Sequence, residues 1–208
     1  MSKAAIGYIN NLRTAIHSLS RWETSGKAFG YIQTVTDDKD DYIYEFFCAM
    51  KVLEDLSNNH RIVLKRGING FVFPKKPGVK RMWARFVGYD STGTTEQFQV
   101  CLGVKIKITA SPLTTFGSDI SIQQAGTSDD PYDSDILLIM DAKYKWENET
   151  VMDIGTIREF AQCVFDMNTP NLVAQYFNSP QMLTLMRTAC LQMVSLIEII
   201  SNTALTVS

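Results

Sequence analysis

The most informative part of the sequence is Asp135-Ile-Leu-Leu-Ile-Met-Asp141-Ala-Lys143-Tyr-Lys145. Its apolar residues 136–140 predict a strand buried on both faces of a sheet, where charged side chains are usually excluded. Because strand side chains alternate, Asp141 and Lys143 leave the sheet on the same face. An acid and a base at the end of a core strand are costly unless something uses them. We therefore expect a divalent metal ion on Asp141, with Lys143 directed at a phosphate or at an attacking water.

The composition is that of an ordinary globular protein. The chain has 208 residues, of which 45% are hydrophobic and 20% are charged, and its net charge is −2. This length predicts a single domain over residues 1–208 with one core. The four cysteines lie far apart and only two histidines occur, which argues against a structural zinc site. Without a signal sequence or a membrane-length apolar span, we expect a cytoplasmic protein with no membrane contact.

The hydrophobic pattern predicts an α/β (α+β) arrangement. Helical spacing of apolar residues predicts helices over 4–20, about 42–58 and about 153–167. Apolar and alternating runs predict further strands over 61–65, 70–74, 81–89, 96–108 and 119–123. The apolar tract that follows Ser179-Pro180 predicts a C-terminal helix over about 180–203, because this residue pair is typical of a helix start. This helix is expected to pack in the core, with a dimer interface as the alternative.

A second carboxylate, Asp119, falls where it can join Asp141. It alternates with the apolar Ile120 and Ile122, so it faces the opposite side of its strand from them. If this strand pairs with 135–145 as a hairpin, Asp119 lies beside Asp141 on the same face. Two carboxylates there repel each other unless a cation sits between them.

The third carboxylate is Glu45, on the helix predicted for 42–58. At 100° per residue it aligns with Ala49, Val52 and Leu56, so it is an acid on the buried stripe of an amphipathic helix. Taken alone, it is best explained as a buried Glu paired with an arginine or a backbone amide. The presence of Asp119 and the Asp-x-Lys pair favours a functional role.

This order of residues resembles the PD-(D/E)XK restriction-endonuclease-like nucleases, which have a Glu on a helix, an Asp on a strand and an Asp-x-Lys on the next strand. The matching residues here are Glu45, Asp119 and Asp141-Ala-Lys143. The string 141–145, followed by a helix that carries Gln162, is similar to the McrC-type nuclease of methylcytosine restriction systems. The resemblance covers roughly residues 40–168, expected to be the catalytic core, and implies a restriction-endonuclease-like mixed central sheet flanked by helices. Ser118 stands where the name-giving motif has proline.

The resemblance implies a metal-dependent DNA endonuclease that hydrolyses phosphodiester bonds in restriction or antiviral defence. Asp119 and Asp141 would ligate Mg²⁺, for which Mn²⁺ can substitute, and Glu45 would complete the shell directly or through water. Lys143 would orient the nucleophilic water or stabilise charge on the phosphate. Gln162 would hold the water or a DNA phosphate.

A basic segment supplies independent support for a nucleic-acid substrate. No acidic residue occurs between His60 and Gly88, although the whole chain carries a net negative charge. A local excess of cations in such a protein can contact several phosphates, although a solvated surface explains it equally well. The residues expected to bind DNA are Lys65, Arg66, Lys75, Lys76, Lys80, Arg81 and Arg85. The aromatic residues among them are expected to pack in the core rather than to stack on bases: Phe71, Phe73, Trp83 and Phe86.

Several functions stay open at this point. The nuclease could act alone as a homodimer, or as a subunit of a larger restriction complex with a separate NTP-driven partner, since the chain lacks a Gly-x-x-x-x-Gly-Lys-Ser/Thr motif. A catalytically inactive nucleic-acid-binding module of the same fold is a further alternative, as is a structural protein whose acids are paired internally. The second Asp-x-Lys string, Asp37-Asp38-Lys39, follows no apolar strand and is expected to be a solvated loop.

Overall fold

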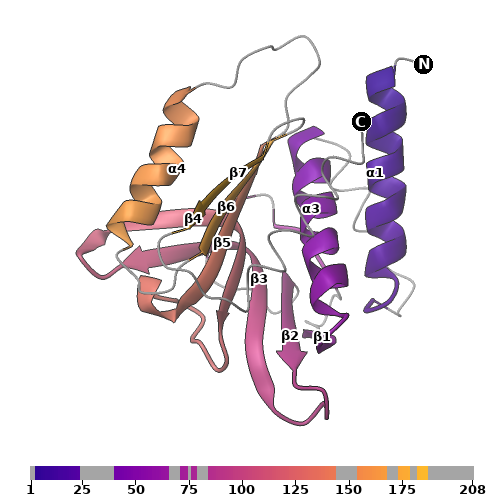
Figure 1. The fold of residues 1–208 in the computed structure, drawn as a ribbon, viewed down its shortest axis with the longest axis horizontal. Helices are drawn as coiled ribbons and strands as arrows, with labels where there is room; N and C mark the ends of the chain where they lie inside the picture. The colour runs from indigo at the N-terminus through magenta and orange to yellow at the C-terminus, as the bar shows by residue number, and fades with distance from the viewer. Residues whose placement is uncertain are drawn as a thin grey trace.

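The computed structural model describes residues 3–23, 40–65, 71–74, 76–78, 84–143, 154–167, 173–178 and 182–186. Helices and strands follow one another along these residues, as Figure 1 shows. In chain order they are α1 (Lys3–Leu19), α3 (Asp40–Leu56), β1 (Arg61–Lys65), β2 (Arg85–Tyr89), β3 (Glu96–Ile108), β4 (Ser111–Gln124), the short 3-10 helix η2 (Asp133–Asp135), β5 (Ile136–Lys143), α4 (Ile154–Asp166), β6 (Val173–Asn178) and β7 (Met182–Met186).

The strands form one seven-stranded sheet in the sequence order β1-β2-β3-β4-β5-β6-β7. Neighbouring strands from β1 to β5 pair antiparallel, β5 and β6 pair parallel, and β6 and β7 pair antiparallel. A parallel pair needs a crossover, and α4 lies in the chain between β5 and β6. The prediction of an α/β protein with a mixed sheet and helices is confirmed.

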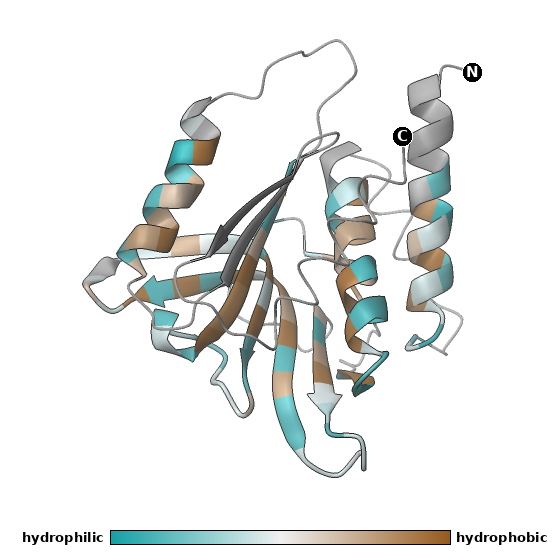
Figure 2. Cartoon of the chain, viewed as in Figure 1, coloured by the Kyte–Doolittle hydropathy of each residue, from teal (hydrophilic) through white to brown (hydrophobic). Residues whose placement is uncertain are grey.

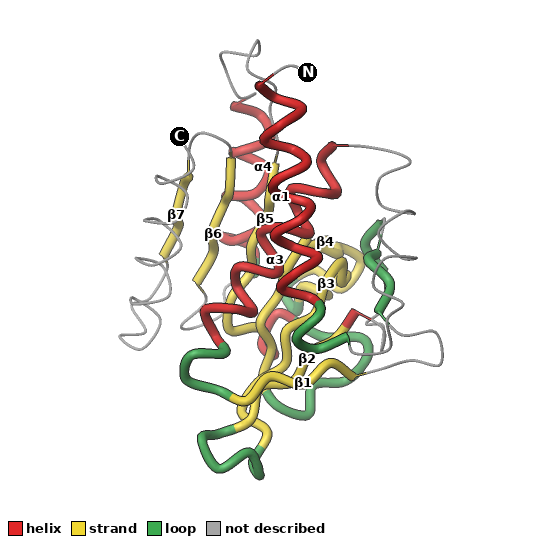
Figure 3. The backbone as a smooth tube through the Cα atoms, turned by 90° about the vertical axis from the view of Figure 1, so that its right-hand side faces the viewer, coloured by secondary structure: helices red, strands yellow, loops and turns green. Residues whose placement is uncertain are grey.

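Helices cover the two faces of the sheet. On one face α1 and α3 run side by side over the strands, whereas α4 lies on the other (Figures 1 and 3). The alternation of β5 explains this arrangement. Leu138, Met140 and Ala142 belong to the cluster under α1 and α3, and Ile139 belongs to the cluster under α4. A strand that is apolar on both sides therefore has both sides covered, as predicted for residues 136–140.

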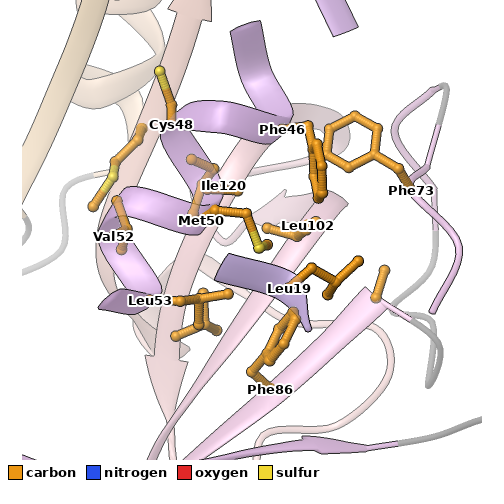
Figure 4. Packing of buried hydrophobic residues seen from close by; sticks show 14 of the residues in the cluster. Leu19, Phe46, Cys48, Met50, Val52, Leu53, Phe73, Phe86, Leu102 and Ile120 are labelled. Atoms are coloured by element: carbon orange, nitrogen blue, oxygen red, sulfur yellow. The ribbon is translucent and has the colours of Figure 1, made fainter. Parts of the chain in front are cut away.

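The larger cluster surrounds α3. Phe46, Met50 and Leu53 of this helix are buried against Leu102 of β3 and Ile120 of β4, as Figure 4 shows. Burial of each such side chain stabilises the fold by about 1.5–3 kcal/mol relative to leaving it in water. Hydrophobic residues accordingly concentrate on the central strands and on the inward helix faces, and the turn between β2 and β3 is hydrophilic (Figure 2).

Most predicted elements are confirmed, with two corrections. Residues 71–74 of the strand predicted over 70–74 have no regular secondary structure, because Pro74 and Pro77 prevent continuous pairing here. The C-terminal helix predicted over about 180–203 is wrong over Met182–Met186, which form β7. A short apolar run does not by itself distinguish a helix from a strand, and pairing with β6 decides for the strand. The rest of that tract lies outside the described residues, as do residues 81–83 of the predicted strand 81–89.

The described helices include none that is both long enough and apolar enough to cross a bilayer. Cys48, Cys101 and Cys163 form no disulfide within the described residues; the first two are buried and Cys163 is partly exposed.

Candidate active site

The candidate site lies where β4 and β5 stop pairing. The antiparallel ladder runs as far as Ile120 and Met140, so the next two opposed residues are Asp119 and Asp141. There the Asp119 carboxylate replaces a backbone acceptor: its Oδ2 accepts a hydrogen bond from the backbone N–H of Ala142 at 2.8 Å. The two predicted strands therefore pair antiparallel as expected, and the point where their pairing stops presents two acids side by side.

Lys143 contacts both acids. Its Nζ donates to Asp141 Oδ1 at 2.6 Å and lies 3.4 Å from Asp119 Oδ2. The side chains of Asp119 and Asp141 are 15% and 11% exposed, whereas that of Lys143 is 39% exposed. The prediction that Asp141 and Lys143 leave the strand on the same face is confirmed, and Asp119 joins them. The ammonium thus neutralises part of a nearly buried carboxylate pair while keeping access to solvent.

Glu45 reaches the same place from α3. It lines a cavity of about 280 Å³ together with Asp119, Asp141 and Lys143. The buried Ala49 and Val52, on the same helical stripe, fix this face of α3 against the sheet. The prediction that Glu45 lies on the inward stripe is confirmed, and its side chain is partly buried.

The electrostatics show that these four groups act on one another. Burial raises the pKa of Asp119 well above its usual value, and the neighbouring Glu45 and Asp141 raise it further against the opposing effect of Lys143. Burial on its own lowers the pKa of Lys143, but Asp119, Asp141 and Glu45 outweigh this and raise it. The cavity therefore gathers three carboxyl groups, of which Asp119 is the one inclined to keep a proton, around the firmly protonated ammonium of Lys143.

A proline-containing segment closes one side of the cavity. We call residues 71–74 and 76–78 the proline strap. Four residues of this strap line the cavity together with Gly103 of β3 and Gly117 of β4: Phe73, Pro74, Lys76 and Pro77. Tyr42 completes the lining from α3, one turn before Glu45. Two signals in the sequence could have identified these residues: the spacing of three residues between Tyr42 and Glu45, and the two prolines of the strap.

Gln162, the expected fifth member of the site, does not line this cavity. It is exposed on α4, where its Nε2 donates to Asp166 Oδ1 at 2.7 Å. The reason is helical geometry: Phe160 and Val164 point into the sheet, and Gln162 lies about 200° from Phe160 around the helix axis. The next residue of α4, Cys163, is partly exposed. Burial is the main cause that raises the pKa of its thiol, and Asp141 is one of the nearby charges that raise it further.

The basic segment is divided by the fold. Lys76 lines the cavity, and its side chain is exposed. Lys65 of β1 and Arg85 of β2 are opposed in the sheet, where Lys65 Nζ donates to the Tyr89 hydroxyl at 3.1 Å. Other residues of the predicted DNA-binding set lie outside the described residues: Arg66, Lys75, Lys80 and Arg81. The aromatic side chains Phe71, Phe73 and Phe86 are buried in the core, as predicted.

The donor chemistry suits a hard divalent cation, although the acids are not already spaced as a cage. Carboxylate oxygens are the ligands that Mg²⁺ prefers. Burial and then the charges of Glu45 and Asp141 raise the pKa of Asp119, and a bound cation would relieve this repulsion. Within the described part of the chain, no three or more His, Cys, Asp or Glu side chains are grouped in a way that could hold a metal ion. In this arrangement the ammonium of Lys143 provides the positive charge between the aspartates.

Comparisons with known proteins add no relative. No protein-family model matches the chain, and neither a curated protein nor a solved structure gives a significant match. The geometry of the cavity is therefore the observation on which a function has to rest.

Proposed function

We propose that this protein is a metal-dependent deoxyribonuclease that hydrolyses phosphodiester bonds. The observation that carries this proposal is the meeting of Asp119, Asp141 and Lys143 just beyond the last paired residues of β4 and β5, in the cavity that Glu45 lines. A purely structural ion pair needs one acid, whereas this site gathers three acids around one lysine. Their arrangement on a helix and two adjacent strands also supports the resemblance to the restriction-endonuclease-like nucleases, and we propose that fold for residues 40–168.

Each protein group has a role in this chemistry that follows from its contacts. Lys143 is the group best placed to stabilise negative charge on a bound phosphate or to orient the attacking water, because its ammonium is charged and partly exposed to the cavity. Asp119 fixes the end of β5 through its hydrogen bond from Ala142. Asp119 and Asp141 together hold Lys143 in position, so its ammonium does not depend on the substrate for its orientation.

A divalent metal is part of the proposal. Glu45, Asp119 and Asp141 are the carboxylates that would hold Mg²⁺ or Mn²⁺, which would supply a Lewis acid and an activated water. The physiological setting we propose is restriction or antiviral defence, with DNA as the substrate and a homodimer or a larger restriction complex as the assembly. Gln162 has no role in the proposal, because its side chain pairs with Asp166 on its own helix.

The test is cleavage by the purified full chain. Single-stranded and duplex DNA are incubated with protein and Mg²⁺ or Mn²⁺, and products are resolved on denaturing gels with and without EDTA. Wild-type protein is expected to cut, and EDTA is expected to stop it. Asp141→Asn keeps the size of the side chain and is expected to lose at least about 10²-fold in rate while remaining folded. Asp129→Asn, at an exposed acid outside the cavity, is the matched control and is expected to cut as the wild type does.

Inactivity of the wild-type chain on DNA and RNA with both metals would refute the proposal, as would full activity of Asp141→Asn.

One specific observation favours a second candidate function, a nucleic-acid-binding module without catalysis: Lys143 already pairs with both aspartates in the structure. In that case DNA binding persists without cleavage, and Asp141→Asn lowers thermal stability, since it removes the closest partner of a partly buried cation.

A further inference from the structure

The proline strap is fixed to the rest of the fold at both ends. At its start, the Phe71 N–H donates to Glu23 Oε2 at 3.2 Å, and Glu23 is a carboxylate only 2% exposed. At its end, the Gly78 N–H donates to the Gly103 carbonyl at 3.0 Å, and the Gly78 carbonyl accepts from the Lys105 N–H at 2.7 Å. Hydrogen bonds to buried groups are costly to break without replacement, so the strap is held in register with β3.

Side chains add a second attachment. The rings of Phe71 and Phe73 lie 5.9 Å and 5.7 Å from that of Phe46 on α3, and Figure 4 shows Phe73 directed at Phe46. Phe46 directly follows Glu45 on α3, so the strap packs against the same helix that carries this acid. Aromatic pairs of this kind contribute about 0.5–1.5 kcal/mol beyond the area they bury.

Two glycines let the strap lie directly on the sheet. A Cβ at Gly117 of β4 would come within 2.5 Å of Pro77 Cγ, and one at Gly103 of β3 within 2.7 Å of Pro74 Cγ. Proline rings cannot swing away, so a side chain at either position would force the strap outward. Gly103 also has a φ of 58°, which disfavours other residues on its own. The sequence thus keeps this wall of the cavity close to Asp119.

Lys76 lies between these prolines and lines the cavity while its side chain is exposed. Its carbonyl oxygen is 3.7 Å from the Cβ position of Gly103, so its backbone is seated on β3. Lys143 is paired with two acids, but no described acidic side chain lies within ion-pair distance of Lys76. An ammonium with no carboxylate partner among the described residues, on a fixed strap beside a cavity of acids, is available to an anion from solution.

We infer that Lys76 binds a phosphate of the nucleic-acid strand at the mouth of the cavity, and that the proline strap fixes the position of that phosphate relative to Asp119 and Lys143. The inference rests on the proposed function for its ligand and adds a substrate-positioning element to it. Lys76 then acts on substrate affinity through one phosphate contact, and the acids and Lys143 act on the chemical step.

Binding without metal tests Lys76 separately from catalysis. Fluorescein-labelled single-stranded and duplex oligonucleotides are titrated in EDTA at several salt concentrations, and anisotropy gives the affinity. Loss of one phosphate contact is expected to reduce the slope of log K against log salt by about 0.7–0.9 and to weaken binding severalfold. Lys76→Ala should show this change. Lys105→Ala, an exposed lysine on β3 that does not line the cavity, is the matched control and should bind as the wild type does.

The strap is tested by a steric substitution and its relief. Gly117→Ala is expected to weaken binding as much as Lys76→Ala does, because the new methyl displaces Pro77. Pro77→Gly in the same chain removes both ring atoms that clash and is expected to restore affinity towards that of Pro77→Gly alone. Circular dichroism checks the folding of each variant. If Gly117→Ala unfolds, the comparison of affinity and salt slope between Lys76→Ala and Lys105→Ala decides the inference.

Equal affinities and salt slopes for Lys76→Ala and Lys105→Ala would overturn the inference, as would wild-type binding by folded Gly117→Ala. The cleavage assay reports separately on the proposed function. Where the wild type cuts DNA, Lys76→Ala should raise KM more than it lowers kcat. If the wild type binds through Lys76 but does not cut, the nuclease proposal fails and the phosphate site stands.

Discussion

Replacement of Lys143 by methionine isolates the charge balance of the cavity. Lys143→Met keeps most of the side-chain length and removes the ammonium that lies 2.6 Å from Asp141 Oδ1 and 3.4 Å from Asp119 Oδ2. At an effective dielectric constant of about 20 these contacts are worth about 6 and about 5 kcal/mol before desolvation, and about 1.6 and about 1.2 kcal/mol in a water-like medium. Since the lysine side chain is 39% exposed, the real values lie between these limits.

The net loss is smaller than the Coulomb sum for two reasons. Desolvation of the ammonium, which costs stability in the wild type, disappears with the charge. In addition, burial and the charges of Glu45 and Asp141 already raise the pKa of Asp119, so this carboxyl group can take up a proton when Lys143 is gone. We expect Lys143→Met to lose about 2 kcal/mol of unfolding free energy near neutral pH, equivalent to a fall of about 4–8 °C in Tm for a domain of this size.

The pH dependence gives a sharper signature. A carboxyl group whose pKa is higher in the folded than in the unfolded state contributes most stability below its unfolded pKa, and this contribution is lost as pH rises through the folded pKa. Asp119 is such a group, and loss of Lys143 removes a nearby positive charge that lowers its pKa. The variant should therefore resemble the wild type at about pH 4 and become progressively less stable than it at higher pH.

Urea and thermal unfolding followed by circular dichroism measure this difference across pH, with and without Mg²⁺. A divalent cation should restore more stability to Lys143→Met than to the wild type, because it replaces the missing positive charge. Lys105→Met, the same change at an exposed position on β3, is the control and should show neither effect. A Lys143→Met protein that matches the wild type at every pH and does not respond to Mg²⁺ would refute the coupling of these four charges.

Two further predictions concern the framework. In the β2–β3 turn, the Asp90 carboxylate accepts hydrogen bonds from the Thr92 hydroxyl and the Thr94 N–H, which lower its pKa to about 2. NMR titration should show this midpoint, and the stability that Asp90 contributes should be present above about pH 4 and lost as pH falls towards about 2; an ordinary midpoint near pH 4 would contradict the turn geometry. In the core, Phe46→Ala should cost about 3–5 kcal/mol in urea unfolding, because Phe46 is fully buried against Phe71 and Phe73. Phe165→Ala, at a side chain that is 68% exposed, should change stability by no more than about 0.5 kcal/mol, and equal losses for the two variants would contradict the assigned core.

The sequence determined the parts of this protein that depend on local periodicity. The apolar run 136–140 becomes a strand covered on both faces, and the alternation around Asp119 places this acid on the face from which Asp141 and Lys143 project. Helical spacing placed Glu45 on the inward stripe of α3. These residues could be predicted because a side chain's direction follows from its position in a regular element.

Tertiary structure decided what periodicity does not encode. The apolar residues 182–186 form an edge strand because β6 offers unpaired backbone groups, and composition alone suits a helix equally well. Gln162 carries the residue type that the resemblance calls for, but the packing of Phe160 and Val164 turns it to solvent. The strap takes its place on the sheet through hydrogen bonds and through Gly103 and Gly117, which are distant from it in sequence. Contacts between distant segments are settled by the packing of the whole chain, and they decide which of the predicted charges share a cavity.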